Sequence, residues 1–201
     1  MKTRICIFGA STTWGMRDNE GGGWVGRLRK YFETNNYDTR VYNLGIPGDT
    51  TTDLLKRFEV ECEARKPDVI IFGIGANDAC YINTEKNMMT SLRQFNKNFS
   101  KLIKKAKKIT NKIILVGLTK VEEIKSMPIL LNKQKFCSNA NIIKYDLAIN
   151  EAGKIHSVPF ISLIDLLTPK DLSDDGRHPN SKGHEKMFLK IKDYLLVNKI
   201  V

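Results

Sequence analysis

The chain has 201 residues, of which 41% are hydrophobic and 27% charged, and its formal net charge is +11. This length and composition are typical of one ordinary globular domain and exclude a disordered chain. No apolar stretch reaches the length of a membrane span, and the apolar run at residues 5–8 is too short for a signal-peptide core. We therefore expect a single domain over residues 1–201, without stable insertion in a membrane.

The basic residues are spread along the chain, and the densest group coincides with a helical pattern of apolar residues at residues 95–106. Such a pattern is typical of a solvated helix face, and no recognition motif or aromatic-interleaved basic run accompanies it. We therefore expect no nucleic-acid partner. The positive charge leaves attraction of anionic substrates or lipid headgroups open.

The cysteines show no Cys-x-x-Cys pair and no histidine at zinc-ligand spacing, so we expect no metal site. They are Cys6, Cys62, Cys80 and Cys137. We interpret all four as free thiols in a reducing compartment, which predicts a cytoplasmic location.

Short apolar runs bounded by turn residues alternate with segments of helical periodicity. Strands are predicted at residues 4–8, 40–44, 69–72, 113–117 and 158–161. Helices are predicted at residues 24–32, 54–62, about 85–108, 139 to about 154, and 180–197. Residues 118–138 have weak periodicity and predict a long loop over the site, with room for one helical turn. This alternation predicts a three-layer α/β sandwich with a five-stranded parallel sheet and helices on both faces.

Polar and glycine-rich turns follow several of these strands. In parallel sheets, ligands bind beyond the carboxyl ends of the strands, so these turns should meet at one edge. Ser11 lies between Gly9 and Gly15 after the first strand, and Asp175 lies three residues before His178 after the fifth. Ester cleavage needs a nucleophile, a base and a group that orients the base. We therefore predict that Ser11 is the nucleophile, His178 the base and Asp175 the orienting carboxylate.

Cleavage also needs donors for the developing oxyanion. We predict the backbone N–H groups of Ser11 and Gly45 and the side-chain amide of Asn77. A glycine suits position 45 because a side chain would block close approach of the substrate to the backbone. Asn77 has an alternative role as a turn cap, and we interpret its neighbour Asp78 as a structural cap. Asp174 competes with Asp175 as the partner of the histidine.

Several other histidines, tryptophans and cysteines are interpreted as structural residues. His156 and His184 lack a motif partner and are expected to be structural or exposed. Trp14 and Trp24 are candidates for pocket walls, although aromatic residues more often lie in the core. Cys80 follows Asn77 closely and is interpreted as a small buried thiol.

Four blocks of the sequence resemble, in order and spacing, the SGNH hydrolases, also called the GDSL esterase/lipase family. The blocks are Gly9-Ala10-Ser11, Asn43-Leu44-Gly45-Ile46-Pro47-Gly48, Gly75-Ala76-Asn77-Asp78 and Asp175-Gly176-Arg177-His178. The resemblance implies a flavodoxin-like sheet and a Ser-Asp-His triad, with the roles given above and Asp175 rather than Asp174 in the triad. It implies hydrolysis of small-molecule carboxylic esters, with short acyl or acetyl esters favoured, and no cofactor.

The chain departs from the family pattern at Ala10, where the family has the aspartate of Gly-Asp-Ser. This departure leaves open a catalytically weak or silent carbohydrate- or lipid-binding relative. A further alternative is a flavodoxin-like phosphate or flavin binder, because hydroxyl residues follow the first strand at Ser11 to Thr13. That alternative leaves Asn77 and the turn before His178 without a role. The natural ester and the oligomeric state remain open.

Overall fold

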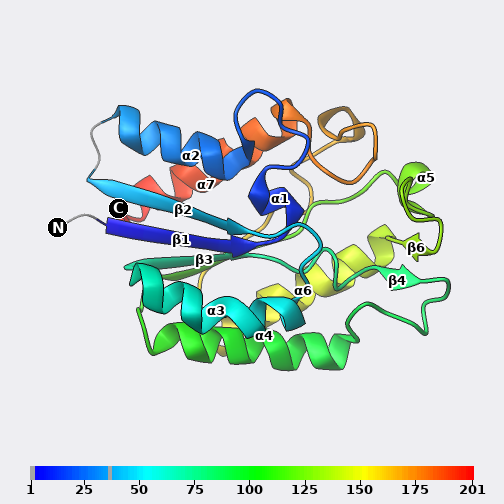
Figure 1. Ribbon diagram of the computed structural model, residues 1–201, viewed down its shortest axis with the longest axis horizontal. Coiled ribbons are helices and arrows are strands. Elements are labelled where there is room, and N and C mark those ends of the chain that lie inside the picture. Colours follow the sequence, from blue (N-terminus) through cyan, green and yellow to red (C-terminus); the bar gives the residue numbers. More distant parts are fainter. Residues whose placement is uncertain (1–2, 36–37) are drawn as a thin grey trace.

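The structure, a computed structural model, describes residues 3–35 and 38–201. Its centre is a parallel sheet of five strands in the order β2-β1-β3-β5-β7 (Figure 1). The strands are β1 (Thr3–Gly9), β2 (Thr39–Gly45), β3 (Val69–Gly73), β5 (Ile113–Val116) and β7 (Phe160–Ile161). This is the flavodoxin-like order, in which the direction of winding reverses between β1 and β3. The predicted fold class and sheet are confirmed.

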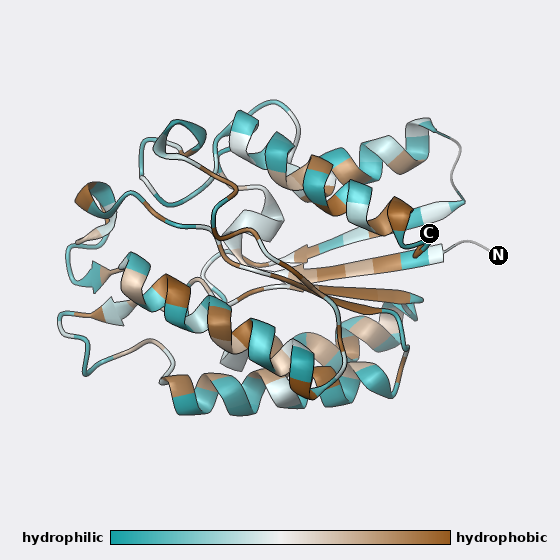
Figure 2. Cartoon of the chain, turned by 180° about the vertical axis from the view of Figure 1, so that it is seen from behind, coloured by the Kyte–Doolittle hydropathy of each residue, from teal (hydrophilic) through white to brown (hydrophobic). Residues whose placement is uncertain are grey.

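Helices cover both faces of the sheet (Figure 1). One face carries α2 (Gly23–Thr34) and α7 (Ser181–Val197). The other carries α3 (Thr51–Arg65), α4 (Leu92–Lys107) and α6 (Asn139–Ile155). Because side chains alternate across a strand, Phe8 of β1 packs in one buried cluster and Ile7 in the other. Both faces are covered, so the inner strands β3 and β5 are apolar along their length, and Figure 2 shows hydrophobic strands at the centre of the sheet beside a more polar edge strand.

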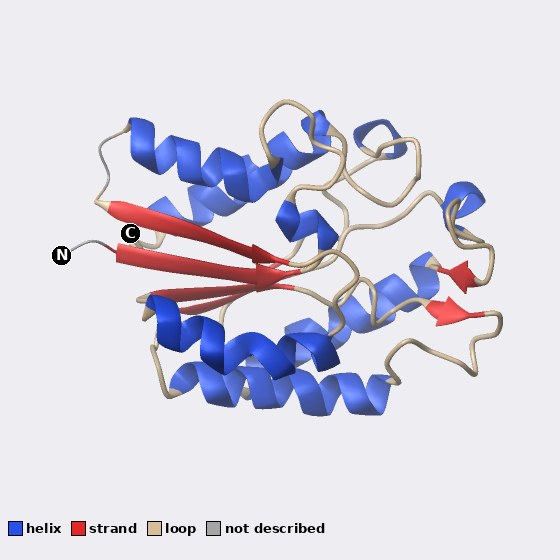
Figure 3. Ribbon diagram, in the orientation of Figure 1, coloured by secondary structure: helices blue, strands red, loops and turns tan. Residues whose placement is uncertain are grey.

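Short elements gather beyond the carboxyl ends of the strands (Figure 3). They are α1 (Ser11–Trp14), β4 (Tyr81–Ile82), α5 (Glu123–Ser126), β6 (Lys135–Phe136) and the 3-10 helix η1 (Pro169–Asp171). Strands β4 and β6 pair in an antiparallel manner, and the rings of Tyr81 and Phe136 stack 5.3 Å apart. The helical turn expected within residues 118–138 is present as α5.

The predicted start of α4, near residue 85, is wrong. The helix begins at Leu92 because the Ser91 side chain accepts a hydrogen bond from the backbone N–H of Gln94 and caps it. The preceding backbone is used for pairing instead: Tyr81 bridges Met88, and the N–H of Met89 donates to the carbonyl of Cys80.

The prediction of four free thiols is also wrong. Cys80 and Cys137 form a disulfide, whereas Cys6 and Cys62 are free and buried in the core. The two bridged cysteines lie 57 residues apart, and only tertiary folding brings them together. Because two of the four cysteines are bridged, free thiols give weaker support for a reducing compartment. The cytoplasmic location stays a prediction.

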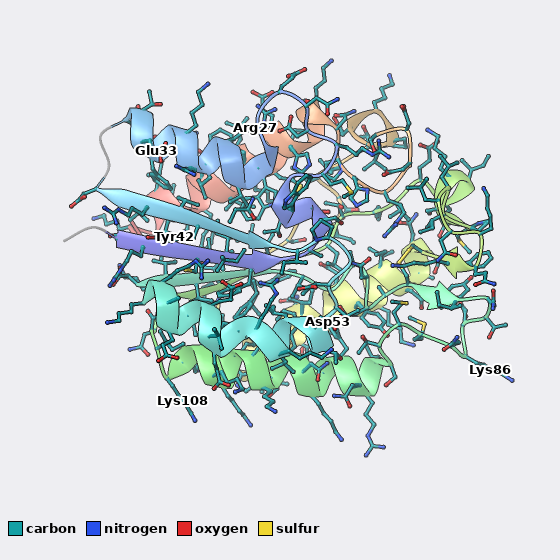
Figure 4. All side chains as sticks on the ribbon, in the orientation of Figure 1. Arg27, Glu33, Tyr42, Asp53, Lys86 and Lys108 are labelled. Atoms are coloured by element: carbon teal, nitrogen blue, oxygen red, sulfur yellow. A yellow bond between two sulfur atoms is a disulfide. The ribbon has the colours of Figure 1, made fainter. Side chains whose placement is uncertain are left out.

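The lysines of α4 lie on its outer face. The buried residues of this helix, among them Phe95, Phe99 and Leu102, face the sheet. Lys108, which follows the helix, points away from the sheet in Figure 4. The solvated helix face is confirmed. Within the described ranges, every helix is too short or too polar to cross a lipid bilayer.

Candidate active site

The three residues of the predicted triad meet at the carboxyl edge of the sheet. The hydroxyl of Ser11 lies 2.8 Å from Nε2 of His178, and Nδ1 of this ring lies 2.6 Å from Oδ2 of Asp175. Ser11 and His178 are 167 residues apart in the sequence, and each side chain is nearly buried. In this chain of contacts, Nδ1–H donates to the carboxylate while Nε2 accepts the proton of the serine hydroxyl.

The Asp175 carboxylate is held in place by the turn that carries it. Its Oδ1 accepts hydrogen bonds from the Ser173 hydroxyl and from the backbone N–H groups of Arg177 and His178. Burial by itself raises the pKa of Asp175, but the hydrogen bonds from His178 and the backbone outweigh it and hold the pKa well below its usual value. Asp175 is therefore ionised whenever the imidazole acts as a base. Its competitor Asp174 is exposed.

Ser11, the predicted nucleophile, is the first residue of α1, and this helix packs against glycines. A Cβ at Gly9 would clash with the side chain of Thr13, and a Cβ at Gly45 would clash with the backbone nitrogen of Trp14. Both glycines are therefore required for α1 to lie against the ends of β1 and β2. We expected a glycine at position 45 to give the substrate access to the backbone. The structure instead shows that Gly45 is needed for the packing of α1.

Ala10 occupies the N-cap position of α1 and makes no side-chain hydrogen bond there. The missing aspartate of the family motif thus leaves this helix start uncapped. Other contacts hold the helix: the Thr13 hydroxyl donates to the carbonyl of Gly73, and the Asn43 amide donates to the carbonyl of Trp14. The position of Ser11 therefore does not depend on a carboxylate at residue 10.

The turn after β2 is fixed by its own polar groups. The Gly45 N–H donates to Oδ1 of Asn43 at 3.0 Å, so this predicted oxyanion donor already has an acceptor. Arg57 of α3 donates to the carbonyls of Gly9 and Leu44, and its Nε lies 2.8 Å from the carboxylate of Asp49. The arginine thus ties the ends of β1 and β2 to the turn.

The side-chain amide of Asn77 is held at both ends. Its Nδ2 donates to the carbonyl of Asp49 at 3.1 Å, and its Oδ1 accepts from the ammonium of Lys135 at 3.0 Å. One N–H of Nδ2 remains for another acceptor. Asn77 lines the same small pocket as Ser11 and His178.

Lys135 reaches Asn77 from β6 and is half-buried. Burial of the ammonium and the nearby charge of Arg177 lower its pKa to about 8. Sequence reasoning missed this residue because it lies in a segment without periodicity, and no local signal places it beside Asn77.

Asp78 has the structural role predicted for it. The buried carboxylate accepts the backbone N–H and the hydroxyl of Thr51 at the start of α3. Because negative charge is favourable at a helix N-terminus, this contact ties the turn after β3 to α3. Burial of the Asp78 carboxyl raises its pKa.

The remaining histidines and tryptophans lie apart from the triad. His184 is buried between the backbone N–H of Trp24 and the carbonyl of Met16. His156 contacts the hydroxyl of Ser100 on the face covered by α4 and α6. Trp24 is a core residue, whereas the Trp14 side chain is 53% exposed beside the nucleophile.

Two small pockets reach Ser11. One, of about 30 Å³, is lined by Asn77, Arg177, His178 and both bridged cysteines, among others. The other, of about 40 Å³, lies under α1 and is lined by Trp24 and Met187, among others. Each has room for only a few atoms beyond the reacting carbon.

Known proteins are similar to this chain in sequence and in fold. The chain is 27% identical over 114 residues to an esterase, TesA, of Pseudomonas aeruginosa, covering 57% of this chain and 53% of the esterase. It spans about half the length of the curated relatives it matches.

Solved structures match over nearly the whole chain. A lipase/acylhydrolase from Enterococcus faecalis has a TM-score of 0.78 and 25% identity, covering 96% of this chain and 95% of that one. A variant of an acetylxylan esterase from Geobacillus stearothermophilus has a TM-score of 0.76 and 21% identity, covering 96% and 94%, and shows the same fold. Residues 7–186 match the GDSL-like Lipase/Acylhydrolase family, and the chain therefore belongs to this family.

Proposed function

We propose that this chain hydrolyses carboxylic esters by acyl transfer through Ser11. One observation carries the proposal: the unbroken chain of contacts from the Ser11 hydroxyl through the His178 ring to the Asp175 carboxylate. The family and the names of the esterase and lipase/acylhydrolase that resemble this chain support it.

The first step forms an acyl-enzyme. The Ser11 oxygen attacks the ester carbonyl while Nε2 of His178 takes the hydroxyl proton, and the Asp175 carboxylate stabilises the imidazolium that forms. The imidazolium then donates this proton to the alcohol oxygen as the ester bond breaks. In the second step, His178 takes a proton from water, which attacks the acyl carbon, and the acid leaves as Ser11 regains its proton.

The oxyanion that forms in each step needs donors. Ser11 is the first residue of α1, so its N–H has no acceptor within the helix. The free N–H of Asn77 supplies a second donor, and the contact with Lys135 fixes which end of the amide faces the carbonyl of Asp49.

For a third oxyanion donor, the backbone N–H of Gly48 is a better candidate than that of Gly45. The Gly45 N–H already bonds to Asn43, whereas Gly48 has a positive φ of 91° and open space beside its Cα. Its neighbour Asp49 accepts the hydrogen bond from Asn77, which brings this turn to the amide. We therefore add the Gly48 N–H to the candidate donors.

The size of the two pockets at Ser11 favours short acyl groups. Volumes of about 30 and 40 Å³ suit an acetyl-sized group next to the reacting carbon. Acetyl and other short acyl esters are therefore the substrates we expect.

The alternative is a weak or silent relative that binds carbohydrate or lipid, and its basis is that Ala10 replaces the aspartate of the family motif. Turnover of p-nitrophenyl acetate separates the two. The proposal predicts hydrolysis by the unmodified chain and its loss in Ser11→Ala. Equal rates for the two proteins would refute it.

A further inference from the structure

A cation lines the pocket that contains the nucleophile. Arg177 lies between Asp175 and His178 in the sequence, and its side chain borders the pocket together with Ser11 and Asn77. The backbone of Arg177 is fixed, because its N–H donates to Oδ1 of Asp175. Its guanidinium is half-buried, and burial lowers its pKa.

This guanidinium has no carboxylate partner among residues 3–35 and 38–201. The ion pairs of the nearby acidic groups are with other residues. Asp175 binds His178 and faces Arg17, and Glu122 pairs with Lys125 at 2.8 Å. The charge of Asp175 favours the protonated guanidinium of Arg177, but burial outweighs it, so the guanidinium can still gain from binding an anion.

A second cation lies behind the pocket wall. The ammonium of Lys135 contacts Asn77, and the charge of Arg177 lowers the pKa of Lys135, so the two positive charges act on the same region. The buried carboxylate of Asp78, which is bonded to Thr51, partly offsets the charge of Lys135, and the carboxylate of Asp175 partly offsets the charge of Arg177. Arg177 therefore borders the pocket next to Ser11 with Lys135 close behind it, and a net charge of +11 adds attraction for anions at longer range.

We propose that this pocket selects anionic esters, in which a carboxylate or phosphate on the substrate binds the Arg177 guanidinium while the ester carbonyl lies at Ser11. This inference rests on the proposed function. The planar fork of arginine suits both groups, because two parallel N–H groups donate to two oxygens. The charge is carried on either the alcohol part or the acyl part of the ester.

Two pairs of esters test the preference and locate the charge. Para-acetoxybenzoate against its methyl ester places the charge on the alcohol part, and monoethyl succinate against ethyl butyrate places it on the acyl part. For each ester, kcat/KM is divided by the rate constant of its reaction with neutral hydroxylamine, which corrects for differences in intrinsic reactivity without the charge repulsion that hydroxide would add. The proposal predicts that the unmodified chain prefers the anionic member of at least one pair by about tenfold at low salt, and less at high salt.

Variants assign the preference to Arg177. Arg177→Gln keeps the backbone contact with Asp175 and should remove about tenfold of the preference, whereas Arg177→Lys should keep part of it. Lys133→Gln, which removes one exposed charge from the segment that carries Lys135, should leave the preference and the basal activity unchanged. An unchanged ratio in Arg177→Gln, or no preference in the unmodified chain, would overturn the inference.

Binding to Ser11→Ala gives a readout that does not require turnover. By calorimetry, this variant should bind para-acetoxybenzoate or monoethyl succinate more tightly than the neutral partner, and Ser11→Ala/Arg177→Gln should lose the difference. Equal binding of the charged and neutral members of both pairs overturns the inference. If neutral esters are hydrolysed through Ser11 without any anion preference, the proposed function stands and this inference fails. If no ester is hydrolysed, the proposed function fails, and the calorimetric comparison still decides whether the pocket binds anions.

Discussion

The described part of the chain contains two serine–histidine contacts of equal length. Ser11 and His178 are 2.8 Å apart, and so are Ser100 and His156. In the first contact, Asp175 lies against the other ring nitrogen. In the second, burial and the positive charges of Lys104 and Lys107 lower the pKa of the ring. No Asp or Glu in the described part of the chain forms an ion pair with His156.

The two serines also differ in their backbone. Ser11 begins α1, so its N–H is free for an oxyanion, whereas Ser100 lies within α4, where backbone N–H groups bond to carbonyls of the preceding turn. The proposed mechanism requires more than close contact between serine and imidazole. It assigns catalysis to the first pair because a carboxylate lies against the imidazole there and candidate oxyanion donors are nearby.

The largest expected effect is a loss of activity on substitution in the Ser11–His178 pair but not in the Ser100–His156 pair. Ser11→Ala should lower kcat for p-nitrophenyl acetate by about 10⁴-fold or more, and adding His178→Ala should lower it little further, because the two residues act as a unit. Ser100→Ala should leave kcat unchanged. The measurement is steady-state hydrolysis by the variants, and loss of activity in Ser100→Ala would mean that the wrong pair has been assigned.

Removal of the orienting carboxylate should make the first pair resemble the second. Asp175→Asn should lower kcat by about 10³- to 10⁴-fold, because an amide favours the wrong tautomer of His178 and does not stabilise the imidazolium. Asp174→Asn, which changes the exposed neighbour, is the matched control and should retain activity. The same kinetic assay applies, and equal effects of the two changes would remove Asp175 from the triad.

Removal of an oxyanion donor tests the second distinction. Asn77→Ala should lower kcat by about 10² to 10³-fold, which corresponds to about 2.7 to 4 kcal/mol of transition-state stabilisation, with little change in KM. A change confined to KM would instead indicate that Asn77 only shapes the pocket.

The tight packing of α1 against Gly45 should make the free energy of unfolding sensitive to substitution there. Gly45→Ala places a methyl group against the backbone of α1 and should lower the free energy of unfolding by about 1 to 3 kcal/mol, as other overpacking changes do. Gly48→Ala adds the same methyl in open space, and its positive φ alone should cost about 1 kcal/mol. Urea denaturation compares them, and a smaller loss in Gly45→Ala would contradict the packing account.

The smallest expected effect concerns Lys135. Its pKa of about 8 means that the ammonium loses its proton as the pH rises through 8, and its hydrogen bond to Asn77 then weakens. We expect kcat to fall by about fivefold between pH 7 and pH 9.5, with this decline absent in Lys135→Gln. Lys133→Gln should keep it. A decline that persists in Lys135→Gln would assign it to another group.

The sheet and the contacts among Ser11, His178 and Asp175 could be predicted because their signals are local. Apolar runs ending in glycine mark β1 and β3, and parallel pairing places their ends at one edge. The contact between Asp175 and His178 spans three residues of one turn. Because Ser11 directly follows β1 and the turn with His178 follows β7, parallel strands bring both residues to the same edge of the sheet.

The features that were missed depend on segments that are distant in the sequence. The disulfide between Cys80 and Cys137, and the contact of Lys135 with Asn77, arise where β4 and β6 pair. Neither strand has a periodic pattern, because each is only two residues long. The reason for Gly45 was missed because a clash with α1 is visible only once the helix is placed.

The central claim is that His178 activates the Ser11 hydroxyl as a nucleophile. The most direct test is mass spectrometry after treatment with a fluorophosphonate, which labels activated serines covalently. We predict one adduct, on Ser11 and not on Ser100, with a labelling rate that falls by about 10²-fold or more in His178→Ala. An adduct on another residue, or an equal rate of labelling in His178→Ala, would contradict the account.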